Sequence, residues 1–443
     1  MEAVEATVPL LKPSSRNLRI CYVMWSARLM LDASRNPRVI ETSRRTTARL
    51  ITNRHTAMAT APGQTGYLYH ETYFWHNAGH VQSFDKHIEA WRHWENPETK
   101  RRMHSLVAVS GLLDKVKHLK PRPATDEELA RVHCPAYIQR VYEMSADDSK
   151  GYHTAGDVAT FSPGGYRIAA LAAGGAIEAM EAVLRGEVRN AYALVRPPGH
   201  HAERDKGMGF CIFNNVAVAA AHALEVHGLR RVAVVDFDVH HGNGTQHMFE
   251  SDRRVLFISL HQDSNYPLRS GYVTETGVGP GEGTTINVPL PPGSGSGAYK
   301  AAFTRVVLPA LEVFQPDLLL VSAGYDASYM DNLAAMILSS ADFGWMMSKL
   351  VEAAEALCGG RLVALHEGGY SELYVPFCGL AALEAMSGVK SEVQDPWLDE
   401  VTSWGYQELQ PHQEAVVAAA EKALDKLRAV VAREGADGSV PGR

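Results

Sequence analysis

The stretch Arg231-Val-Ala-Val-Val-Asp-Phe-Asp-Val-His-His-Gly-Asn-Gly-Thr245 joins a short apolar run to a dense group of polar side chains. The run over residues 231–237 is rich in valine and has the length of a buried strand. Side chains alternate across a strand, so Asp236, Asp238 and His240 share one face if the strand continues. The pattern predicts two carboxylates and an imidazole that point to one place at a strand end.

Similar apolar runs alternate with helix-like stretches from about Gly66 to Gly388, which predicts an α/β fold, a mostly parallel sheet with helices on both faces. We expect strands over residues 191–195, 231–237, 255–260, 286–290, 317–322 and 362–366. We expect helices over residues 163–185, 212–227, 298–314, 340–357 and 411–432. The Pro/Gly/Ser-rich stretch 289–297 is a loop rather than a linker, because helix signals follow at once. A single domain over residues 63–435 is therefore expected.

Residues 1–62 are expected to form a separate N-terminal arm. Residues 1–57 carry a net charge of +6, so the remaining 386 residues carry about −13 of the chain's total of −7. The arm is rich in Arg, Ser and Thr and has no clear apolar period, which is compatible with a transit peptide, a disordered arm or upstream sequence that is not normally translated. We favour the last two, because Met58 offers a second start just before the first strand-like stretch. An arm packed on the body is the remaining alternative.

The composition, 46% hydrophobic and 21% charged, is that of a globular protein with a large buried core. No apolar run is long enough to cross a membrane, and the acidic balance gives no general affinity for nucleic acid. The five cysteines are scattered without zinc-finger spacing, which indicates reduced residues and a cytoplasmic protein. The helix after Pro411 could pack on the body or on a second subunit, which leaves a homo-oligomer open.

Asp238 and His240 have the spacing of two metal ligands from one segment. Asp326 follows another predicted strand through a Gly-Tyr turn, and ligands of open parallel sheets bind beyond the carboxyl ends of the strands. Three protein ligands with an open fourth position are typical of a catalytic zinc site, although two oxygens and one nitrogen also suit Fe²⁺ or Co²⁺. The alternative is that Asp-x-Asp-x-His caps a helix and binds no metal.

Two further segments that follow predicted strands carry candidate catalytic groups. His200 and His201 come after Pro-Pro-Gly, a rigid turn in which Gly199 allows a close backbone approach. Imidazole has a pKa suited to taking a proton from an attacking water and giving one to a leaving group. Tyr370, after Glu-Gly-Gly, offers a phenol to a developing oxyanion. Taken singly, each of these side chains could instead be a packed residue.

Together these segments closely resemble the zinc-dependent histone deacetylase superfamily, which shares the arginase/deacetylase fold. The runs Gly209-Phe-Cys-Ile-Phe-Asn-Asn215 and Pro376-Phe-Cys-Gly-Leu380 are most similar to the class II branch and to bacterial histone-deacetylase-like amidohydrolases. The resemblance implies one Zn²⁺ per chain, held by Asp238, His240 and Asp326. It further implies the following catalytic residues: His201 as general base and acid, His200 as its electrostatic partner, Asp236 as the carboxylate that orients His200, and Tyr370 as the transition-state tyrosine.

The resemblance also implies residues around this centre. A structural K⁺ is expected among Asp236, Ser259, Leu260 and the backbone oxygens of Asp238 and His240. Asn243 stands where class I members carry an aspartate beside the second tandem histidine, and a neutral partner should leave His201 less basic. The substrate tunnel is expected to be lined by Gly209, Phe210, Tyr266 and Leu333.

These residues predict hydrolysis of the amide of an N-acetylated amine to acetate and a free amine. In class II acetylpolyamine deacetylases, a glutamate seven residues after the third zinc ligand is the gatekeeper for the cationic polyamine, and that position here is Leu333. We therefore expect acetyl-lysine in a protein or peptide as the substrate, with an acetylpolyamine or another small amine as the alternative.

Two other classes of protein fit less well. Arginases and agmatinases use two manganese ions and Asp-x-His-x-Asp runs, whereas residues 238–242 lack the second aspartate. A catalytically inactive acyl-binding module would lack a metal ligand, the base or the tyrosine, and none of these is missing from the sequence.

Overall fold

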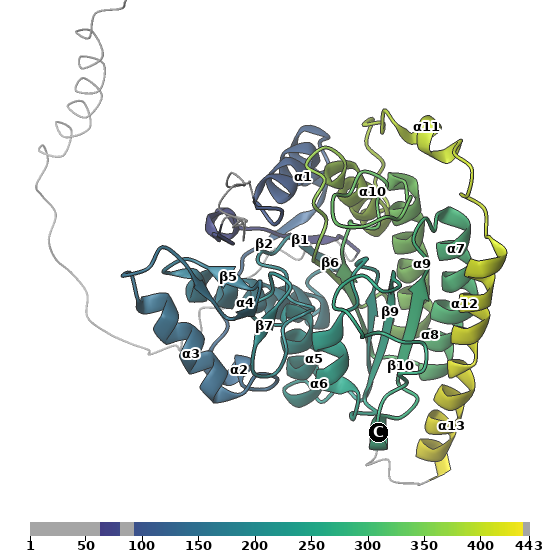
Figure 1. Cartoon of the computed structure of the whole chain (residues 1–443), viewed down its shortest axis with the longest axis horizontal. Helices are drawn as coiled ribbons and strands as arrows, with labels where there is room; N and C mark the ends of the chain where they lie inside the picture. The colour runs from purple at the N-terminus through teal and green to yellow at the C-terminus, as the bar shows by residue number, and fades with distance from the viewer. Residues whose placement is uncertain (1–62, 80–92, 437–443) are drawn as a thin grey trace, which may run out of the picture. The chain divides into compact units, whose positions relative to one another are not determined.

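An eight-stranded sheet forms the centre of the protein, and all of its neighbouring strands run parallel (Figure 1). The computed structural model describes residues 63–79 and 93–436, which belong to one compact unit, Met58–Arg443. The predicted arm, residues 1–62, lies outside the described residues. From edge to edge the strands are β10 (Thr285–Leu290), β9 (Val255–Gln262), β8 (Val232–Asp236), β11 (Leu318–Ala323), β12 (Leu362–His366), β6 (Ala191–Ala193), β1 (Gly66–Leu68) and β2 (Lys117–Leu119). The predicted α/β class is confirmed.

Helices cover both faces of the sheet and bury two apolar cores. Strand β8 shows why the strands are apolar throughout: Val232 and Val234 enter one core, while Ala233 and Val235 enter the other. The first core lies under α2 (Asp126–Leu129), α3 (Pro135–Ala146), α4 (Gly165–Leu184), α5 (Asn215–Glu225) and α6 (Asn243–Phe249). The second lies under α1 (Glu98–Val109), α7 (Ser296–Ala302), α8 (Leu308–Phe314), α9 (Ser340–Cys358), α10 (Val375–Ser387), α12 (Pro411–Glu421) and α13 (Ala423–Ala436).

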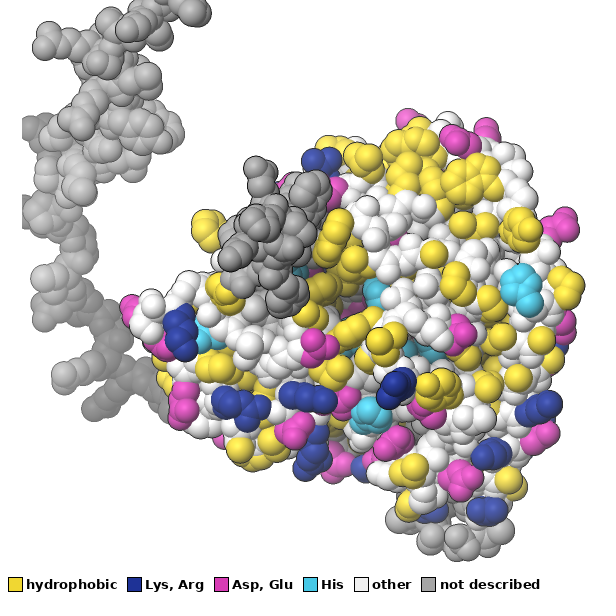
Figure 2. All heavy atoms as spheres, in the orientation of Figure 1, with side chains coloured by type: hydrophobic (Ala, Val, Ile, Leu, Met, Phe, Trp, Pro, Cys, Tyr) yellow, Lys and Arg dark blue, Asp and Glu magenta, His cyan; other side chains and the backbone are white. Residues whose placement is uncertain are grey.

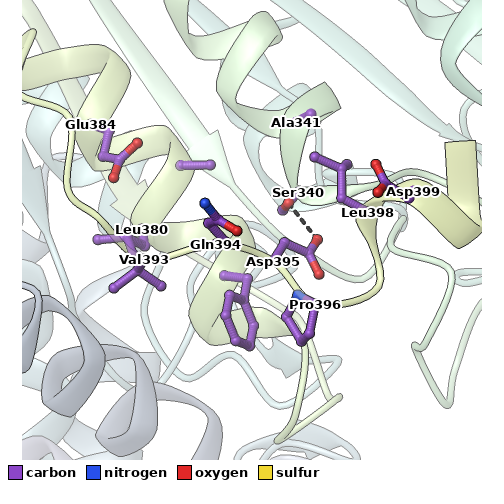
Figure 3. A pocket seen from close by; sticks show the side chains of 12 residues that line it. Ser340, Ala341, Leu380, Glu384, Val393, Gln394, Asp395, Pro396, Leu398 and Asp399 are labelled. Carbon is purple, nitrogen blue, oxygen red and sulfur yellow. Dashed lines mark hydrogen bonds between the residues drawn. The ribbon is translucent and has the colours of Figure 1, made fainter.

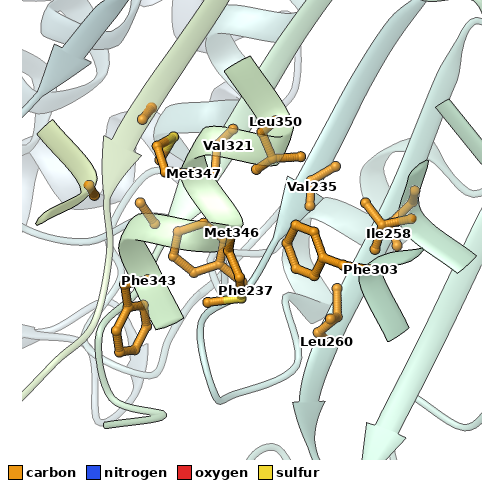
Figure 4. Packing of buried hydrophobic residues seen from close by; sticks show 14 of the residues in the cluster. Val235, Phe237, Ile258, Leu260, Phe303, Val321, Phe343, Met346, Met347 and Leu350 are labelled. Atoms are coloured by element: carbon orange, nitrogen blue, oxygen red, sulfur yellow. The ribbon is translucent and has the colours of Figure 1, made fainter. Parts of the chain in front are cut away.

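In the second core, helix α9 packs directly on strands β8 and β11. Figure 4 shows Met346, Met347 and Leu350 of α9 beside Val235 of β8 and Val321 of β11. All five side chains are fully buried. Burial of such a side chain stabilises the fold by about 1.5–3 kcal/mol, so this contact holds β8 and β11 in place.

Capping residues set the ends of several helices. The Asp342 carboxylate accepts the backbone N–H of Ser339 at 2.9 Å before α9, and Gly359 ends that helix with a φ of 64°. The Asn214 side chain accepts the N–H of Ala217, so α5 begins at Asn215 rather than at the predicted residue 212.

The remaining elements are short. Four strands form two-stranded sheets: β3 (His153–Thr154) pairs with β5 (Thr160–Phe161), and β4 (Gly156–Asp157) pairs with β7 (Gly207–Met208). Short helical turns are η1 (Glu71–Trp75), η2 (Leu113–Lys115), η3 (Gly279–Gly281), the π-helical η4 (Phe303–Val307) and the α-helix α11 (Leu398–Thr402).

The C-terminal helices pack on the body of the same chain. Val417 and Ala420 of α12 and Leu427 of α13 are fully buried in the second core, so the helix after Pro411 packs on the body of its own chain. Within residues 63–79 and 93–436, none of the helices combines the length and apolar character that a membrane crossing requires.

The strand order explains where a site can form. Strands β8, β11, β12 and β6 are successive neighbours, and their carboxyl ends lie at one edge of the sheet. The four polar segments singled out in the sequence follow these four strands. The fold therefore brings these four segments, which are far apart in the sequence, together at that edge.

Candidate active site

Asp238, His240 and Asp326 meet at this edge as a buried group that could hold a metal ion. Asp238 Oδ1 and Asp326 Oδ2 each lie 3.1 Å from Nδ1 of His240. The other oxygen of each carboxylate accepts a backbone N–H: Asp238 Oδ2 from Gly368 and Asp326 Oδ1 from Val239, both at 2.8 Å. Each carboxylate is thus fixed by the backbone and directs its second oxygen toward the shared centre.

The surroundings of these side chains fit a cation. Burial opposes a charged imidazole, but the carboxylates of Asp326 and Asp238 outweigh it and raise the pKa of His240 to about 10. Gly324 and Gly368 line the carboxylates so closely that an added Cβ would lie 2.1 Å from Asp238 Oδ2 or 2.2 Å from Asp326 Oδ2. Two carboxylate oxygens and one imidazole nitrogen suit zinc.

Strand β8 ends at Asp236, so the condition that the strand continues to His240 is not met. Local hydrogen bonds replace the sheet ladder: Asp238 N–H donates to Asp236 Oδ1 at 3.1 Å, and His240 N–H donates to Asp238 Oδ1 at 2.9 Å. Phe237 and Val239 are buried in the second core. The alternation predicted from the sequence therefore persists beyond the strand.

The two tandem histidines lie beside this group with different partners. Nδ1 of His200 lies 3.0 Å from Asp236 Oδ2, and Nδ1 of His201 lies 2.8 Å from Asn243 Oδ1. Gly199 allows this turn, because an added Cβ would lie 2.4 Å from the backbone nitrogen of Asn215.

The partners and surroundings give the tandem histidines opposite charge preferences. Burial opposes a charged His200, but Asp238 and Asp236 outweigh it and raise its pKa to about 10. The pKa of His201 falls well below its usual range, first through burial and then through the neighbouring imidazoles of His200 and His240. Because Nδ1 of His201 faces Asn243, its Nε2 is the nitrogen left to accept a proton.

Tyr370 faces the same centre from the segment after β12. Its backbone N–H donates to Asp331 Oδ2 at 2.7 Å, and Asp331 Oδ1 accepts the N–H of Leu333 at 2.8 Å. Burial and the charge of Asp326 raise the pKa of Asp331 to about 8. One part-buried carboxyl group therefore fixes both Tyr370 and Leu333.

A cavity of about 200 Å³ leads to these groups and is lined by Val158, His201, Gly209, Phe210, His240, Asn265, Tyr266, Leu333 and Tyr370. The ring of Tyr266 stands perpendicular to that of His201 at 4.9 Å, and the Phe210 ring lies 5.9 Å from Tyr370. Gly209 is required here, because an added Cβ would lie 2.3 Å from Cδ2 of His201. All four residues predicted to line a tunnel line this cavity.

Two cavity residues, Val158 and Asn265, were absent from the sequence prediction, as was Asp157, which contacts the cavity residue Tyr266. Tyr266 donates from its hydroxyl group to Asp157 Oδ2 at 2.9 Å, and Asn265 donates to the carbonyl oxygen of Leu333 at 3.2 Å. The pairing of β4 with β7 brings Asp157 to the cavity, and no motif marks that pairing in the sequence.

The residues predicted to hold a monovalent cation also lie together. Strand register places Ser259 of β9 and Ser322 of β11 on either side of Asp236. Leu260 follows Ser259 in β9 and is fully buried. The hydroxyl group of Ser322 is buried and has no hydrogen-bond partner among the described residues.

A larger hollow, about 360 Å³, lies between α10 and the segment before α11 (Figure 3). Two of its three carboxylates are already engaged: Asp395 accepts from Ser340 Oγ at 2.6 Å, and Glu384 accepts from Ser391 Oγ at 2.6 Å. None of the predicted site residues lines it. Figure 2 shows hydrophobic side chains gathered on this part of the face, whereas charged groups of both signs predominate over α2 and α6.

Comparison with known proteins shows the family to which the chain belongs. A family model described as histone deacetylase domain covers residues 93–386. The chain belongs to the histone deacetylase family. It is 48% identical to histone deacetylase-like amidohydrolase of Pseudomonas aeruginosa over 343 residues, which are 76% of this chain and 89% of that protein. It is 40% identical to polyamine deacetylase HDAC10 of Homo sapiens over 62% of this chain and 43% of that protein. The crystal structure of the HDA15 HD domain superposes with a TM-score of 0.73 at 31% identity, covering 85% of this chain and 98% of that one.

Membership of the histone deacetylase family confirms the predicted resemblance and the arginase/deacetylase fold. The chain is a hydrolase that acts on the amide bond of acetylated amines. The arginase and agmatinase alternative is excluded by this match, which agrees with the missing second aspartate in residues 238–242.

Proposed function

We propose that the chain is a zinc-dependent deacetylase whose substrate is acetyl-lysine in a protein or peptide. One observation carries the proposal: Asp238, His240 and Asp326 meet His201 and Tyr370 at a narrow cavity walled by aromatic rings. A cavity of this kind suits the extended apolar stem of an acylated lysine, because the aromatic faces of Phe210 and Tyr266 can contact that stem.

In the proposed mechanism, Asp238, His240 and Asp326 would hold the zinc ion, which when bound polarises the acyl carbonyl and the attacking water. His201 accepts the proton of that water at Nε2, since Nδ1 is occupied by Asn243. His200, oriented by Asp236, is the electrostatic partner of His201, and the Tyr370 phenol donates a hydrogen bond to the negative charge that develops on the acyl oxygen. His201 then gives its proton to the departing amine.

Leu333 supports the choice of substrate. It lines the cavity where the resemblance places a glutamate in acetylpolyamine deacetylases. A leucine offers no charge to the second ammonium group of a polyamine, whereas it can contact a peptide substrate. The relative named polyamine deacetylase HDAC10 makes an acetylpolyamine the alternative that must be tested.

The test compares kcat/KM of the zinc-loaded chain on an acetyl-lysine peptide and on N8-acetylspermidine, for the natural chain and for Leu333→Glu. We expect the natural chain to prefer the peptide and Leu333→Glu to shift the ratio toward the polyamine. The shift should be about tenfold or more, since one close charge pair contributes about 1.5–3 kcal/mol. A natural chain that prefers N8-acetylspermidine would refute the choice of acetyl-lysine.

The proposal includes a structural K⁺, a domain and a compartment. Asp236, Ser259, Leu260 and the backbone oxygens of Asp238 and His240 would hold the K⁺, supported by the unpartnered Ser322 hydroxyl group beside Asp236. Residues 63–435 would form the deacetylase domain. A cytoplasmic location is supported by the free thiols of the described cysteines, although two plant relatives are named chloroplastic. Entry of a fluorescent fusion of residues 1–62 into an organelle would overturn it.

A further inference from the structure

The hydrogen-bonded chain that begins at His201 does not end at Asn243. The Asn243 amide donates from Nδ2 to Glu203 Oε1 at 2.5 Å. Both oxygens of Glu203 in turn lie 2.9 Å from Nδ1 of His247. Four side chains therefore run from the buried catalytic imidazole to the surface, where the His247 side chain is 47% exposed.

These contacts give the Asn243 amide only one orientation. Its Nδ2 group has two hydrogens, and it faces two oxygen acceptors, Glu203 Oε1 and the carbonyl oxygen of His201 at 3.3 Å, besides the sulfur of Met208 at 3.6 Å. A flipped amide would place its own oxygen against the Glu203 carboxylate and leave two acceptors in contact. Oδ1 of Asn243 must therefore face Nδ1 of His201, which is 2.8 Å away.

That orientation fixes the tautomer of His201. Because Asn243 Oδ1 can only accept, the hydrogen of a neutral His201 lies on Nδ1 and the lone pair lies on Nε2. Nε2 is the nitrogen that is required to accept the proton of the attacking water. An asparagine without such partners could present either end of its amide to His201, so the constraint comes from the acceptors at Nδ2, among which Glu203 makes the shortest contact.

Glu203 is held firmly enough to impose this constraint. Its side chain is 12% exposed, its backbone N–H donates to Lys206 and its backbone oxygen lies 2.9 Å from the ring nitrogen Nδ1 of His133. His247 follows Asn243 by four residues in α6, so both side chains lie on the same face of that helix and reach one carboxylate.

We propose that Glu203, held by His247, is a positioning residue for deacetylation: it fixes the Asn243 amide so that His201 presents Nε2 as the proton acceptor. Glu203 also provides the negative charge that an aspartate at position 243 would carry. The inference rests on the role proposed above for His201. A purely structural Glu203–His247 ion pair would stabilise the start of α6 and leave turnover unchanged.

The test exchanges the carboxylate and the amide between two positions and measures kcat and KM on an acetyl-lysine peptide with the zinc-loaded chain. We expect Glu203→Gln to lower kcat by about 10–100-fold, the usual range for residues that orient a primary group, with KM and zinc content unchanged. Asn243→Asp alone should also lower kcat, because it places two carboxylates in the 2.5 Å contact. The double variant Asn243→Asp/Glu203→Gln restores one carboxylate and one amide, so its kcat should return to within about threefold of the natural value.

Glu225→Gln is the matched control, because Glu225 pairs with Arg254 at 3.0 Å and has no contact with Asn243 in the described structure. Its kcat should stay unchanged. A Glu203→Gln kcat within threefold of the natural value, or a double variant no better than the single ones, overturns the inference. Where a single variant fails to fold, as shown by its thermal melting, the double variant decides alone. A natural chain inactive on the peptide would instead contradict the proposed function.

Discussion

Replacement of Tyr370 by phenylalanine removes one hydroxyl group from the cavity and leaves the rest of the site in place. The ring should stay where it is, because its backbone N–H is held by Asp331 at 2.7 Å and its ring packs against Phe210. Loss of one donor to a developing oxyanion lowers kcat by about 10²–10³, or about 2.7–4 kcal/mol of transition-state stabilisation. We expect a fall of that size with KM nearly unchanged.

The assay is acetate release from an acetyl-lysine peptide, with zinc content and thermal melting measured on the same samples. Tyr266→Phe is the matched control, because it also removes a hydroxyl group from this cavity. That hydroxyl group donates to Asp157. Such a hydrogen bond contributes about 0.5–1.5 kcal/mol, so its kcat should fall less than about tenfold. Tyr370→Phe with the natural kcat would refute the role of Tyr370, and equal losses in both variants would show that the hydroxyl groups act only through packing.

Two further predictions concern a glycine and a buried ion pair. Gly209→Ala should lower kcat by about tenfold or more, because its Cβ would lie 2.3 Å from His201, whereas Gly151→Ala, with no atom within 4 Å of its Cβ, should have no effect. Burial opposes a charged Glu95, but Arg196 and Lys100 outweigh this effect and lower the pKa of Glu95. The charged Glu95 therefore stabilises the folded state above about pH 4.3, and this stabilisation is lost as the pH falls below that value. Glu95→Gln should reduce the free energy of unfolding at pH 7 by about 3–5 kcal/mol, and the difference from the natural chain should shrink in acid; equal denaturation curves at both pH values would contradict this.

The central strands could be predicted from the sequence because both of their faces are buried. Strands β8, β9, β11 and β12 carry largely apolar runs, and each of them, like the edge strand β10, lies within one or two residues of its predicted range. Strands β1 and β2 are only three residues long and carry too few side chains to show a pattern.

The missed helices have physical reasons as well. Helix α10 is buried on most of its surface and lacks the polar face that marks an amphipathic helix. Helix α1 buries Thr99 and Lys100 beside Met103 and Val107. Its buried face is therefore partly polar and gives no clear apolar period in the sequence. Lys100 can be buried there because it contacts Glu95, a partner that the sequence does not reveal.

The site residues that come directly after the strands could be predicted from the sequence. His201, Asp238, Asp326 and Tyr370 follow four neighbouring strands, and parallel strands end at the same edge. Glu203 lies two residues after His201 but carries no recognised signal. Its contacts with Asn243 and His247 depend on the path of the loop before α5 and on the position of α6, which only the folded chain defines.

The central claim is that one zinc ion, held by Asp238, His240 and Asp326, is required for deacetylation. The most direct measurement adds zinc to metal-free protein and follows acetate release from an acetyl-lysine peptide together with bound zinc. We predict activity that rises to a plateau at one zinc per chain, and neither bound zinc nor activity for Asp326→Ala. Full activity of the metal-free protein, or an Asp326→Ala variant with one bound zinc and natural turnover, would contradict the account.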